Sequence, residues 1–434
     1  MITYNTYFNS EKELEDFIAK KQIEDSEKLM IQFFTSYTDE EFIRAKLKFL
    51  NRLYPNASLI GSTTDGLIKD GLVSTDNSVV TFTKLEHTKI KTYITDEFDD
   101  YFDAGEKLAK NLIQKDTKLI ISFIDGLTGN GEEFLNGISS FNDKVIVSGG
   151  LASDNAKFEK TLVFDKENIY TNGAVGISLS SESLHIYTDY NFNWLPIGRE
   201  MIVTKCDKNR VYTIDNKTAT DTYQYYLGEG VSKKLPAVGI EFPLIIKRDG
   251  LSIARAALAK NEDGSLVFAG NFKNGDIVQF AYGDSHAILS SSNSSMDKIS
   301  TYPIETIFLY SCMARRRFMP NDIANETLPY NSIAPTSGFF TYGEFFTGKK
   351  RELLNQTLTI LALSESDEVA KKDIKYNVSV DGSSQHEDTI KALSNIVQVT
   401  SEEIYTINTK QTKIYNKLYE IGKNINETIE AEEL

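Results

Sequence analysis

The last 45 residues of the chain carry apolar residues in uninterrupted steps of three and four, the spacing of one face of a supercoiling helix. A helix over these residues would be about 60 Å long at 1.5 Å per residue, which is more than a single helix can bury against its own compact domain. We therefore predict a coiled-coil signalling helix over 386–434 that forms a homodimer through residues 390–428. The predicted a and d positions are Ile390, Leu393, Val397, Thr400, Ile404, Ile407, Gln411, Ile414, Leu418, Ile421, Ile425 and Thr428.

The residues of this repeat leave two questions open. The β-branched a positions suit a parallel dimer, whereas the Ile-rich d positions also permit higher oligomers, and Gln411 could fix the register. Apolar residues off the seam widen the stripe, so the alternative is a helix that lies back on the globular part. These residues are Ile396, Tyr405, Tyr415 and Tyr419.

Composition narrows the class of partner. The chain has 434 residues, with 47 Lys and Arg against 62 Asp and Glu and a net charge of −15, which argues against nucleic acid or an anionic lipid surface. Two cysteines, Cys206 and Cys312, are typical of a reducing compartment and exclude CxxC metal clusters. The N-terminus lacks a signal-peptide pattern, and apolar runs such as 119–124 are far too short to span a bilayer. We expect a soluble, cytoplasmic protein.

Apolar runs alternate with helical patterns in the first half of the chain. Strands are expected at 29–34, 57–63, 118–124 and 144–150, and helices at 39–53, 100–114 and 131–138. This alternation predicts an α/β layer with some parallel pairing. Strand candidates then follow one another from Thr161 to Tyr190, so the first domain, 1–198, is mixed rather than purely doubly wound.

A second unit is predicted over 199–364. It contains a hairpin around 259–270, a helix near 285–299 and three late strands that end at Leu363, so we expect an α+β domain. Residues 365–385 are polar and are interpreted as a linker. The predicted fold class is thus two mixed α/β and α+β domains followed by the long C-terminal helix.

Small and hydroxyl residues follow several of the expected strands. The segments GSTTDG (61–66) and SGGLASDN (148–155) come directly after apolar strands, and the loop DGLTGNGEEF (125–134) joins a strand to a helix. Ligands collect where strand ends converge, because backbone N–H groups and hydroxyls point into the crevice there. A shared pocket is the functional interpretation, and ordinary turns and helix caps are the structural one. The loop lacks the Gly-Lys-Ser/Thr of a phosphate-binding loop.

The segment IFLYSCMARRRF places Cys312 beside Arg315, Arg316 and Arg317. Neighbouring guanidinium groups would favour a thiolate, yet no histidine is placed near the thiol, so a buried core cysteine is the better interpretation. An arginine of this cluster could bind a ligand carboxylate, with Glu344 or a nearby acid pairing a ligand ammonium or the arginine itself. A structural salt bridge is the alternative.

No catalytic motif of a hydrolase, metalloprotease or P-loop enzyme occurs in the chain, so no enzyme class gains support. His386 opens the heptad segment, but no ATP-binding domain follows it, which argues against a phosphorylated histidine of a sensor kinase. We expect neither a metal site nor a cofactor.

The chain resembles the FIST sensory proteins over about 29–363. The resemblance rests on GSTTDGLI, SGGLASDNAKFEKTLVF and NGAVGISL in the first part, and on LYSCMARRRF, GFFTYGEF and LLNQTLTIL in the second. Carried over by position, the motif residues are Gly61, Ser62, Thr63, Thr64, Gly149, Gly150, Asp154, Cys312, Arg315, Tyr342, Gly343, Glu344 and Asn355. Several of these could be purely structural.

The resemblance implies a FIST N-like domain, a FIST C-like domain and a sensory, non-catalytic function in prokaryotic signalling, with amino acids or related metabolites proposed as small-molecule ligands. The tail looks like the signalling helices that precede kinase, cyclic-dinucleotide or chemoreceptor outputs, so a signalling protein in trans is expected as partner. Alternatives are an enzyme that uses Cys312 with the adjacent arginines on an anionic substrate, or a ligand-free interaction scaffold. The ligand-binding candidates are Ser62, Thr63, Thr64, Asp125, Asn130, Gly149, Gly150, Asp154, Arg315, Tyr342 and Glu344.

Overall fold

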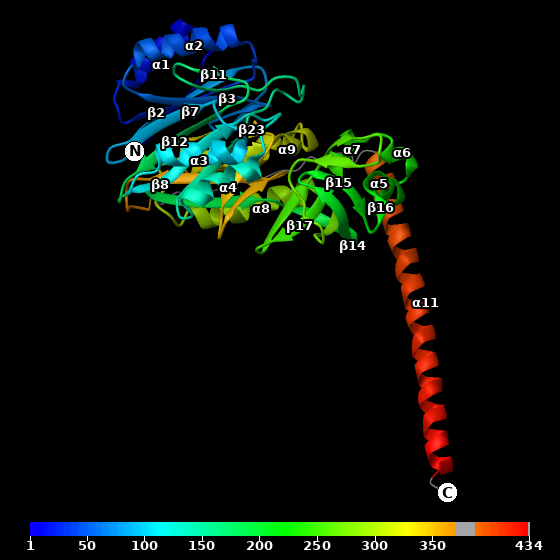
Figure 1. Cartoon of the computed structure of the whole chain (residues 1–434). Coiled ribbons are helices and arrows are strands. Elements are labelled where there is room, and N and C mark those ends of the chain that lie inside the picture. The colour runs from blue at the N-terminus through cyan, green and yellow to red at the C-terminus, as the bar shows by residue number, and fades with distance from the viewer. Residues whose placement is uncertain (370–386, 433–434) are drawn as a thin grey trace.

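The computed structural model describes residues 1–369 and 387–432. Over these residues the chain forms three six-stranded sheets, one eight-stranded sheet and a long C-terminal helix (Figure 1). This confirms the predicted class of mixed α/β sheets followed by a C-terminal helix. Most of the predicted linker, and His386, lie outside the described residues.

The three six-stranded sheets have the same internal order. In each sheet the third and fourth strands are parallel and every other pair is antiparallel. The first sheet runs β1 (Ile2–Tyr7), β6 (Ser78–Lys84), β2 (Leu29–Thr35), β3 (Ser58–Thr63), β10 (Val163–Asp165) and β11 (Ile169–Tyr170). The second runs β7 (Lys89–Thr95), β12 (Ala174–Ser180), β8 (Thr117–Ile124), β9 (Ile146–Leu151), β24 (Glu344–Thr347) and β25 (Arg351–Leu354). The third runs β13 (His185–Asn191), β26 (Leu358–Ser364), β22 (Thr306–Cys312), β23 (Thr336–Thr341), β4 (Leu67–Lys69) and β5 (Leu72–Ser74).

The chain therefore contains a threefold internal repeat, over 2–84, 89–180 and 185–364. Each repeat builds four strands of its own sheet and donates one hairpin to a neighbouring sheet. The hairpin β4–β5 joins the third sheet, β10–β11 joins the first and β24–β25 joins the second. Because this exchange is cyclic, the segments 1–198 and 199–364 share their sheets.

Helices cover the outer face of each sheet. α1 (Glu11–Lys21) and α2 (Glu40–Leu53) pack on the first sheet, α3 (Tyr101–Leu112) and α4 (Gly131–Phe141) on the second, and α8 (Ser285–Ile299) and α10 (Ile323–Thr327) on the third. In α2 the buried Ile43, Leu47 and Leu50 recur every three or four residues, which places them on one helical face. The short α9 (Met313–Phe318) follows β22, and a 3-10 helix spans Leu328–Ser332.

The inner faces of the three sheets meet in one apolar core. Phe34, Phe123 and Tyr310 occupy equivalent positions in the three sheets. In each case the preceding residue pairs with a glycine of the neighbouring parallel strand. Their rings surround Phe339, with centroids 4.5, 5.2 and 5.6 Å from that of Phe339. Aromatic pairs at these distances attract each other beyond simple area burial, so the internal symmetry axis is closed by packed rings.

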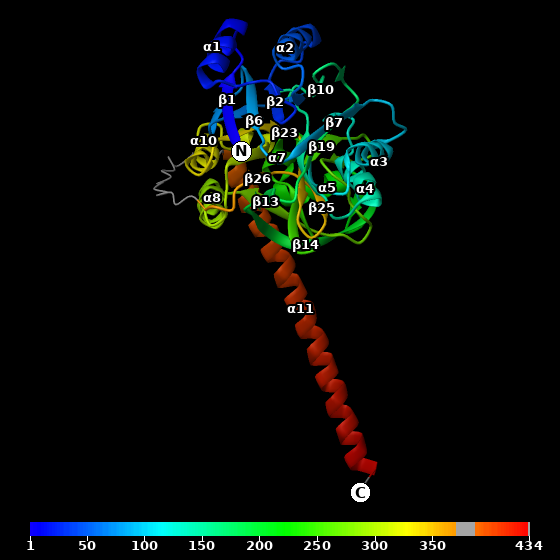
Figure 2. The ribbon, with the colours of Figure 1, turned by 90° about the vertical axis from the view of Figure 1, so that its left-hand side faces the viewer.

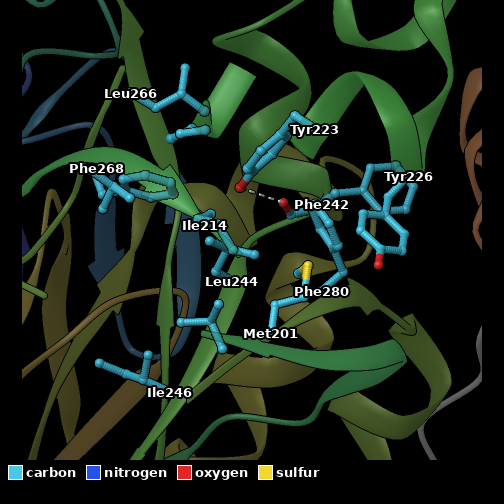
Figure 3. Close-up of a cluster of buried hydrophobic side chains, with 14 of the residues drawn as sticks. Met201, Ile214, Tyr223, Tyr226, Phe242, Leu244, Ile246, Leu266, Phe268 and Phe280 are labelled. Atoms are coloured by element: carbon cyan, nitrogen blue, oxygen red, sulfur yellow. Dashed lines mark hydrogen bonds between the residues drawn. The ribbon is translucent and has the colours of Figure 1, made fainter. Parts of the chain in front are cut away.

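A β-rich unit over residues 194–283, which we term the insert, interrupts the third repeat between β13 and α8. Its sheet encloses a core that includes Tyr223, Phe242, Phe268 and Phe280, and the Tyr223 hydroxyl donates to the Phe242 carbonyl at 3.2 Å (Figure 3). Its elements are β14 (Trp194–Asp207), β15 (Arg210–Ile214), β16 (Lys217–Thr218), α5 (Ala219–Leu227), α6 (Glu229–Ser232), α7 (Ala237–Glu241), β17 (Leu244–Arg248), β18 (Leu251–Arg255), β19 (Ala257–Lys260), β20 (Leu266–Phe268) and β21 (Ile277–Gly283). The boundary predicted between 198 and 199 falls inside β14.

The C-terminal helix α11 (Glu387–Glu432) begins on the insert and then leaves the body of the molecule, as Figures 1 and 2 both show. The alternative of a helix that lies back on the globular part holds only for the first turns. The apolar side chains of Ile404, Ile414 and Leu418 are 52%, 58% and 62% exposed. Among the described residues, no helix combines the length and apolarity needed to cross a membrane.

Candidate functional site

Three equivalent strand ends meet at one end of the symmetry axis. After β3, β9 and β23 the chain makes the same cyclic set of backbone bonds: Asp65 N to Phe340 O at 3.1 Å, Ser153 N to Thr63 O at 3.1 Å, and Tyr342 N to Leu151 O at 3.3 Å. Glycine makes this close approach possible. A Cβ on Gly61, Gly149 or Gly338 would lie 2.1, 2.0 or 1.7 Å from a carbonyl oxygen of the parallel neighbour strand.

Three hydroxyl residues at this junction, Ser153, Thr64 and Thr63, already have partners. The Ser153 hydroxyl donates to Phe340 O at 2.6 Å and accepts from Asp65 N at 2.7 Å. The Thr64 hydroxyl donates to Phe340 O at 3.1 Å, and Thr63 Oγ1 accepts from Leu162 N at 3.0 Å. These side chains therefore tie the strand ends to one another.

Asp154 organises the loop that follows β9. Its carboxylate accepts backbone N–H bonds from Phe158 at 2.9 Å, Glu159 at 2.7 Å and Lys160 at 2.9 Å, and a bond from the Tyr342 hydroxyl. Burial alone would raise the pKa of Asp154, but these hydrogen bonds outweigh it and lower the pKa. The same Tyr342 ring stacks on Phe158 at 4.8 Å.

A buried carboxylate, Asp65, binds two arginines of the ARRR segment. Arg316 Nη2 lies 2.6 Å from one Asp65 oxygen and Arg317 Nη2 lies 3.1 Å from the other, and both guanidinium groups also bond Asn155 at 3.0 Å. Desolvation still raises the pKa of Asp65 above its usual range, because the carboxyl group is fully buried. The arginines thus join the first strand end to the Asp154 loop.

Arg315 points elsewhere. It forms a fully buried ion pair with Glu326, and its Nη1 donates to the carbonyls of Phe192 at 2.9 Å and Gln356 at 3.1 Å. The structural salt bridge that the sequence left open is thus present, and the acid that makes it is Glu326. Removing one partner of such a pair leaves a buried charge uncompensated.

Glu344 and Cys312 are both buried at the same end of the third repeat. Glu344 accepts hydroxyl bonds from Thr341 at 2.5 Å and Thr357 at 2.6 Å, while burial raises the pKa of Glu344 to about 8. Burial also raises the pKa of the Cys312 thiol well above its usual value, and the nearby Glu344 adds to this. A thiol in this environment is a poor nucleophile, so the geometry gives the Cys312 enzyme alternative no support.

The remaining candidates lie around this junction in structural roles. Asp125 accepts from Thr128 N at 2.7 Å and from the Thr161 hydroxyl, and Asn130 caps α4 by accepting from Glu133 N at 3.1 Å. A Cβ on Gly150 would lie 2.4 Å from Gly343 O. The Ser62 hydroxyl is buried without a hydrogen-bond partner among the described residues.

The structure thus brings most of the candidates to one junction and leaves Arg315 outside it. The residues of the three strand ends and the Asp154 loop lie together, and Arg315 faces α10. Contact of these residues with a ligand stays a prediction.

A polar groove of about 640 Å³ lies elsewhere, between the second sheet and the insert. Volumes of this order are typical of small-molecule sites, which favour the boundary between two units of a chain. In the sequence Glu132 and Glu133 stand only within the strand-to-helix loop 125–134, and no motif marks the other residues. Its lining residues are Glu132, Glu133, Leu135, Asn136, Lys208, Arg248, Asp249, Asn271, Phe272, Lys273, Asp276, Lys350, Arg351, Glu352 and Leu353.

Glu132 is the centre of the contact between α4 and the insert. Its carboxylate pairs with the fully buried Arg255 and accepts Asn271 N at 3.0 Å, while Arg248 lies 3.5 Å from it and 3.2 Å from Asp276. Arg255 also donates to Asn355 Oδ1 at 2.7 Å. These bonds fix one wall of the groove to the other.

Four charged side chains of the groove are free to meet a ligand. Within the described chain, the side chains of Glu133, Glu352, Lys208 and Lys273 have no hydrogen-bonded or ion-paired partner. Burial raises the pKa of Glu352, with neighbouring Arg248 opposing the shift. The groove therefore offers two carboxylates and two ammonium groups.

The first turns of α11 are anchored on the far side of the insert. Ala392 and Ile396 are fully buried in the core of the insert, and Glu403 pairs with Arg199 at 2.9 Å and accepts from the Tyr226 hydroxyl. Asn395 Nδ2 donates to Tyr226 O at 2.8 Å. The insert thus lies between the groove and the C-terminal helix.

The face of α11 that contacts the insert overlaps one side of its heptad seam. Ala392, Asn395, Ile396 and Glu403 occupy c, f and g positions, and two d residues also face the insert, since Leu393 packs against its core and Thr400 Oγ1 is buried. The a residues Val397 and Ile404 are 56% and 52% exposed, so the a side of the seam stays accessible where the helix is anchored. The side chains of Ile425 and Thr428 lie outside the described residues.

Comparison with protein families matches two adjacent segments of the chain. Residues 28–217 match the FIST N domain and residues 219–347 match the FIST C domain. Matches to curated proteins were sought, and none was found. Among the described residues, no group of His, Cys, Asp and Glu side chains is arranged to hold a metal ion. The chain belongs to the FIST family, with a FIST N domain followed by a FIST C domain, both of which are signal-transduction sensor domains.

Proposed function

We propose that this protein is a sensor that binds a small polar ligand, an amino acid or a related metabolite, in the groove between α4 and the insert. The observation that carries the proposal is the position of the insert, which forms one wall of the groove and also anchors α11. A ligand that draws the two walls together would therefore act on the element that holds the signalling helix.

The charges of the groove favour a ligand that carries both signs. The carboxylate of Glu352 suits an ammonium group, and Lys208 and Lys273 suit a carboxylate. The strand-end candidates are proposed to frame the sensor domains rather than to touch this ligand, because nearly all of their polar groups are already hydrogen-bonded within the chain.

Occupancy is proposed to reach a signalling protein in trans through a dimer of α11. From Ile404 to Ile421 the apolar residues of the seam are exposed, and a second copy of the helix is the surface that can bury them together. A ligand shifts such an equilibrium only if it binds one packing state more tightly than the other. The groove and α11 must therefore be coupled through the insert.

Thermal unfolding of the full chain in the presence of each of the twenty amino acids tests ligand binding. A ligand at a hundred times its Kd stabilises the folded state by about 2.7 kcal/mol. We expect at least one amino acid to raise the melting temperature of the wild type, and mass spectrometry of material released from the natively purified protein to identify related compounds.

The matched variants are Glu352→Gln and Lys273→Gln in the groove and Glu24→Gln on an exposed surface. The groove variants should lose the stabilisation by ligand, while Glu24→Gln should retain it. An equal response of all three variants, or no response of the wild type to any compound, would refute the proposed site.

A further inference from the structure

A second cavity, of about 700 Å³, lies at the edge of the first sheet. It shares no lining residue with the groove between α4 and the insert. Four consecutive residues of β1, Thr3 to Thr6, line it. Successive side chains of a strand point to opposite faces of the sheet, so a cavity that touches all four lies beside the edge of the strand. The opposite wall is formed by Phe17 and Lys21 of α1, by Lys69 and Asp70, and by Asn331, Ala334 and Pro335.

The backbone at this edge is unpaired. Phe8 N donates to Ser78 O at 2.8 Å, which makes this pair a hydrogen-bonded one. Because hydrogen-bonded pairs alternate in an antiparallel ladder, Tyr4 and Thr6 turn their backbone groups toward β6, and Thr3 and Asn5 turn theirs toward the cavity. Within the part of the chain that the structure describes, β1 pairs only with β6.

Asn5 also leaves a buried acceptor without a donor. Its amide nitrogen donates to Asp70 at 2.9 Å and to Thr336 O at 3.2 Å, but its Oδ1 has no partner among the described residues. The side chain is over nine-tenths buried, so this oxygen costs free energy unless a ligand donates to it.

Two lysines and one aspartate lie at the rim of the cavity. The Lys21 ammonium lies 5.3 Å from the Tyr4 ring centroid, and that of Lys69 lies 5.3 Å from the Tyr7 ring centroid and is ion-paired with Asp70 at 2.6 Å. In a chain of net charge −15, this excess of positive charge, which Lys21 supplies, attracts an acidic partner.

We propose that an extended acidic peptide segment of another protein adds to β1 as a seventh strand of the first sheet. Its backbone bonds Thr3 and Asn5, its carboxylates face Lys21 and Lys69, and an N–H or amide donor reaches Asn5 Oδ1. Recognition of this kind combines main-chain bonds with a few side-chain contacts. The site is independent of the ligand groove and of the α11 seam, and provides a second surface through which a sensor can hold a partner.

Selection from a displayed library of random heptapeptides on the full chain tests the proposal. The matched baits are the double variant Lys21→Glu/Lys69→Glu and the control Lys20→Glu, which changes an exposed residue of the same helix that does not line the cavity. We expect enriched peptides to be acidic, to bind Lys20→Glu as they bind the wild type, and to bind the double variant at least about tenfold more weakly. No enrichment, or enrichment that ignores the double variant, would overturn the proposal.

Amide hydrogen exchange with an enriched peptide tests the strand addition itself. We expect the amides of Thr3 and Asn5 to become protected. Thr3→Pro removes one edge donor and the 3.1 Å hydroxyl contact with Thr83, but no backbone bond to β6, and should abolish binding. Binding without this protection would overturn the proposal, and so would self-association that Thr3→Pro abolishes, because the edge would then belong to a second copy. A Thr3→Pro protein that fails to fold leaves the charge variants and the exchange measurement decisive.

Discussion

Two isoleucines of α11 separate the anchoring of the helix from its proposed dimerisation. Ile396 is fully buried in the core of the insert, and Ile404, about two turns further on, is 52% exposed on the seam. Replacing each with Ala removes the same atoms from different surroundings. The two variants therefore serve as each other's control.

The expected costs follow from burial. Ile396→Ala empties a packed site, where such a change costs about 2–5 kcal/mol, and it should weaken docking of the first turns independently of protein concentration. About half of the Ile404 side chain is exposed and can therefore be buried by a dimer. At roughly 0.8 kcal/mol per buried methylene, Ile404→Ala should cost the dimer about 1.2 kcal/mol per chain, or about 2.4 kcal/mol in total. That corresponds to a roughly 50-fold rise in the dimer Kd.

Analytical ultracentrifugation over a concentration series measures the dimer, and hydrogen exchange of 389–403 measures docking. Ile404→Ala should shift only the first measurement, and Ile396→Ala mainly the second. A wild type that sediments as a monomer at all concentrations, or two variants with indistinguishable effects, would refute the assignment of separate faces.

Three further predictions concern the strand-end junction. Burial raises the folded-state pKa of Glu344 to about 8, above its unfolded value, so the folded state holds a proton that the unfolded state releases. The free energy of unfolding should therefore fall as pH rises from about 5 to 8, by up to about 1.4 kcal/mol per pH unit. Urea unfolding at several pH values measures this slope, and Glu344→Gln should flatten it. Gly61→Ala places a Cβ 2.1 Å from a main-chain carbonyl of β2 and should destabilise the fold by about 3 kcal/mol or more, whereas Gly230→Ala, with open space around it, should not; equal denaturation midpoints would contradict the geometry. Asp154→Ala removes the acceptor of three loop amides, whose hydrogen exchange should accelerate while that of β8 stays unchanged.

Local patterning was sufficient to predict most single elements. Apolar runs such as the one in β2 and the spacing of Ile43, Leu47 and Leu50 in α2 are properties of adjacent residues, and the structure confirms both elements. The hairpin exchange is different. β4 pairs with a strand about 270 residues away, and its three residues carry no periodicity that names a partner.

The repeat left only a faint trace in the sequence. A glycine recurs at Gly61, Gly149 and Gly338, and an aromatic residue recurs one position after each glycine's strand partner, but loops of different length and the insert separate them. The sequence placed the strand ends 61–66 and 148–155 together because it assumed one α/β layer. In the structure β3 and β9 belong to different sheets, and their ends meet because the three sheets surround the internal axis, which the local pattern does not predict.

The groove could not be found by the same reasoning. Glu132 and Arg255 lie in different units and meet only through the packing of α4 on the insert, so neither is part of a continuous motif. The sequence also assigned Ile396 to a widened stripe. Its actual place in the core of the insert explains why an off-seam residue is apolar while the a residues of the seam stay exposed.

Hydrogen exchange of the full chain, with and without the amino acid that stabilises it most, tests the proposed relay from groove to helix most directly. The account predicts that the ligand changes exchange both in the groove loops, 248–250 and 271–276, and in the anchored turns of α11, 389–403. It also predicts that Glu352→Gln abolishes both changes together. Protection confined to the groove, with α11 indifferent to the ligand, would contradict the account.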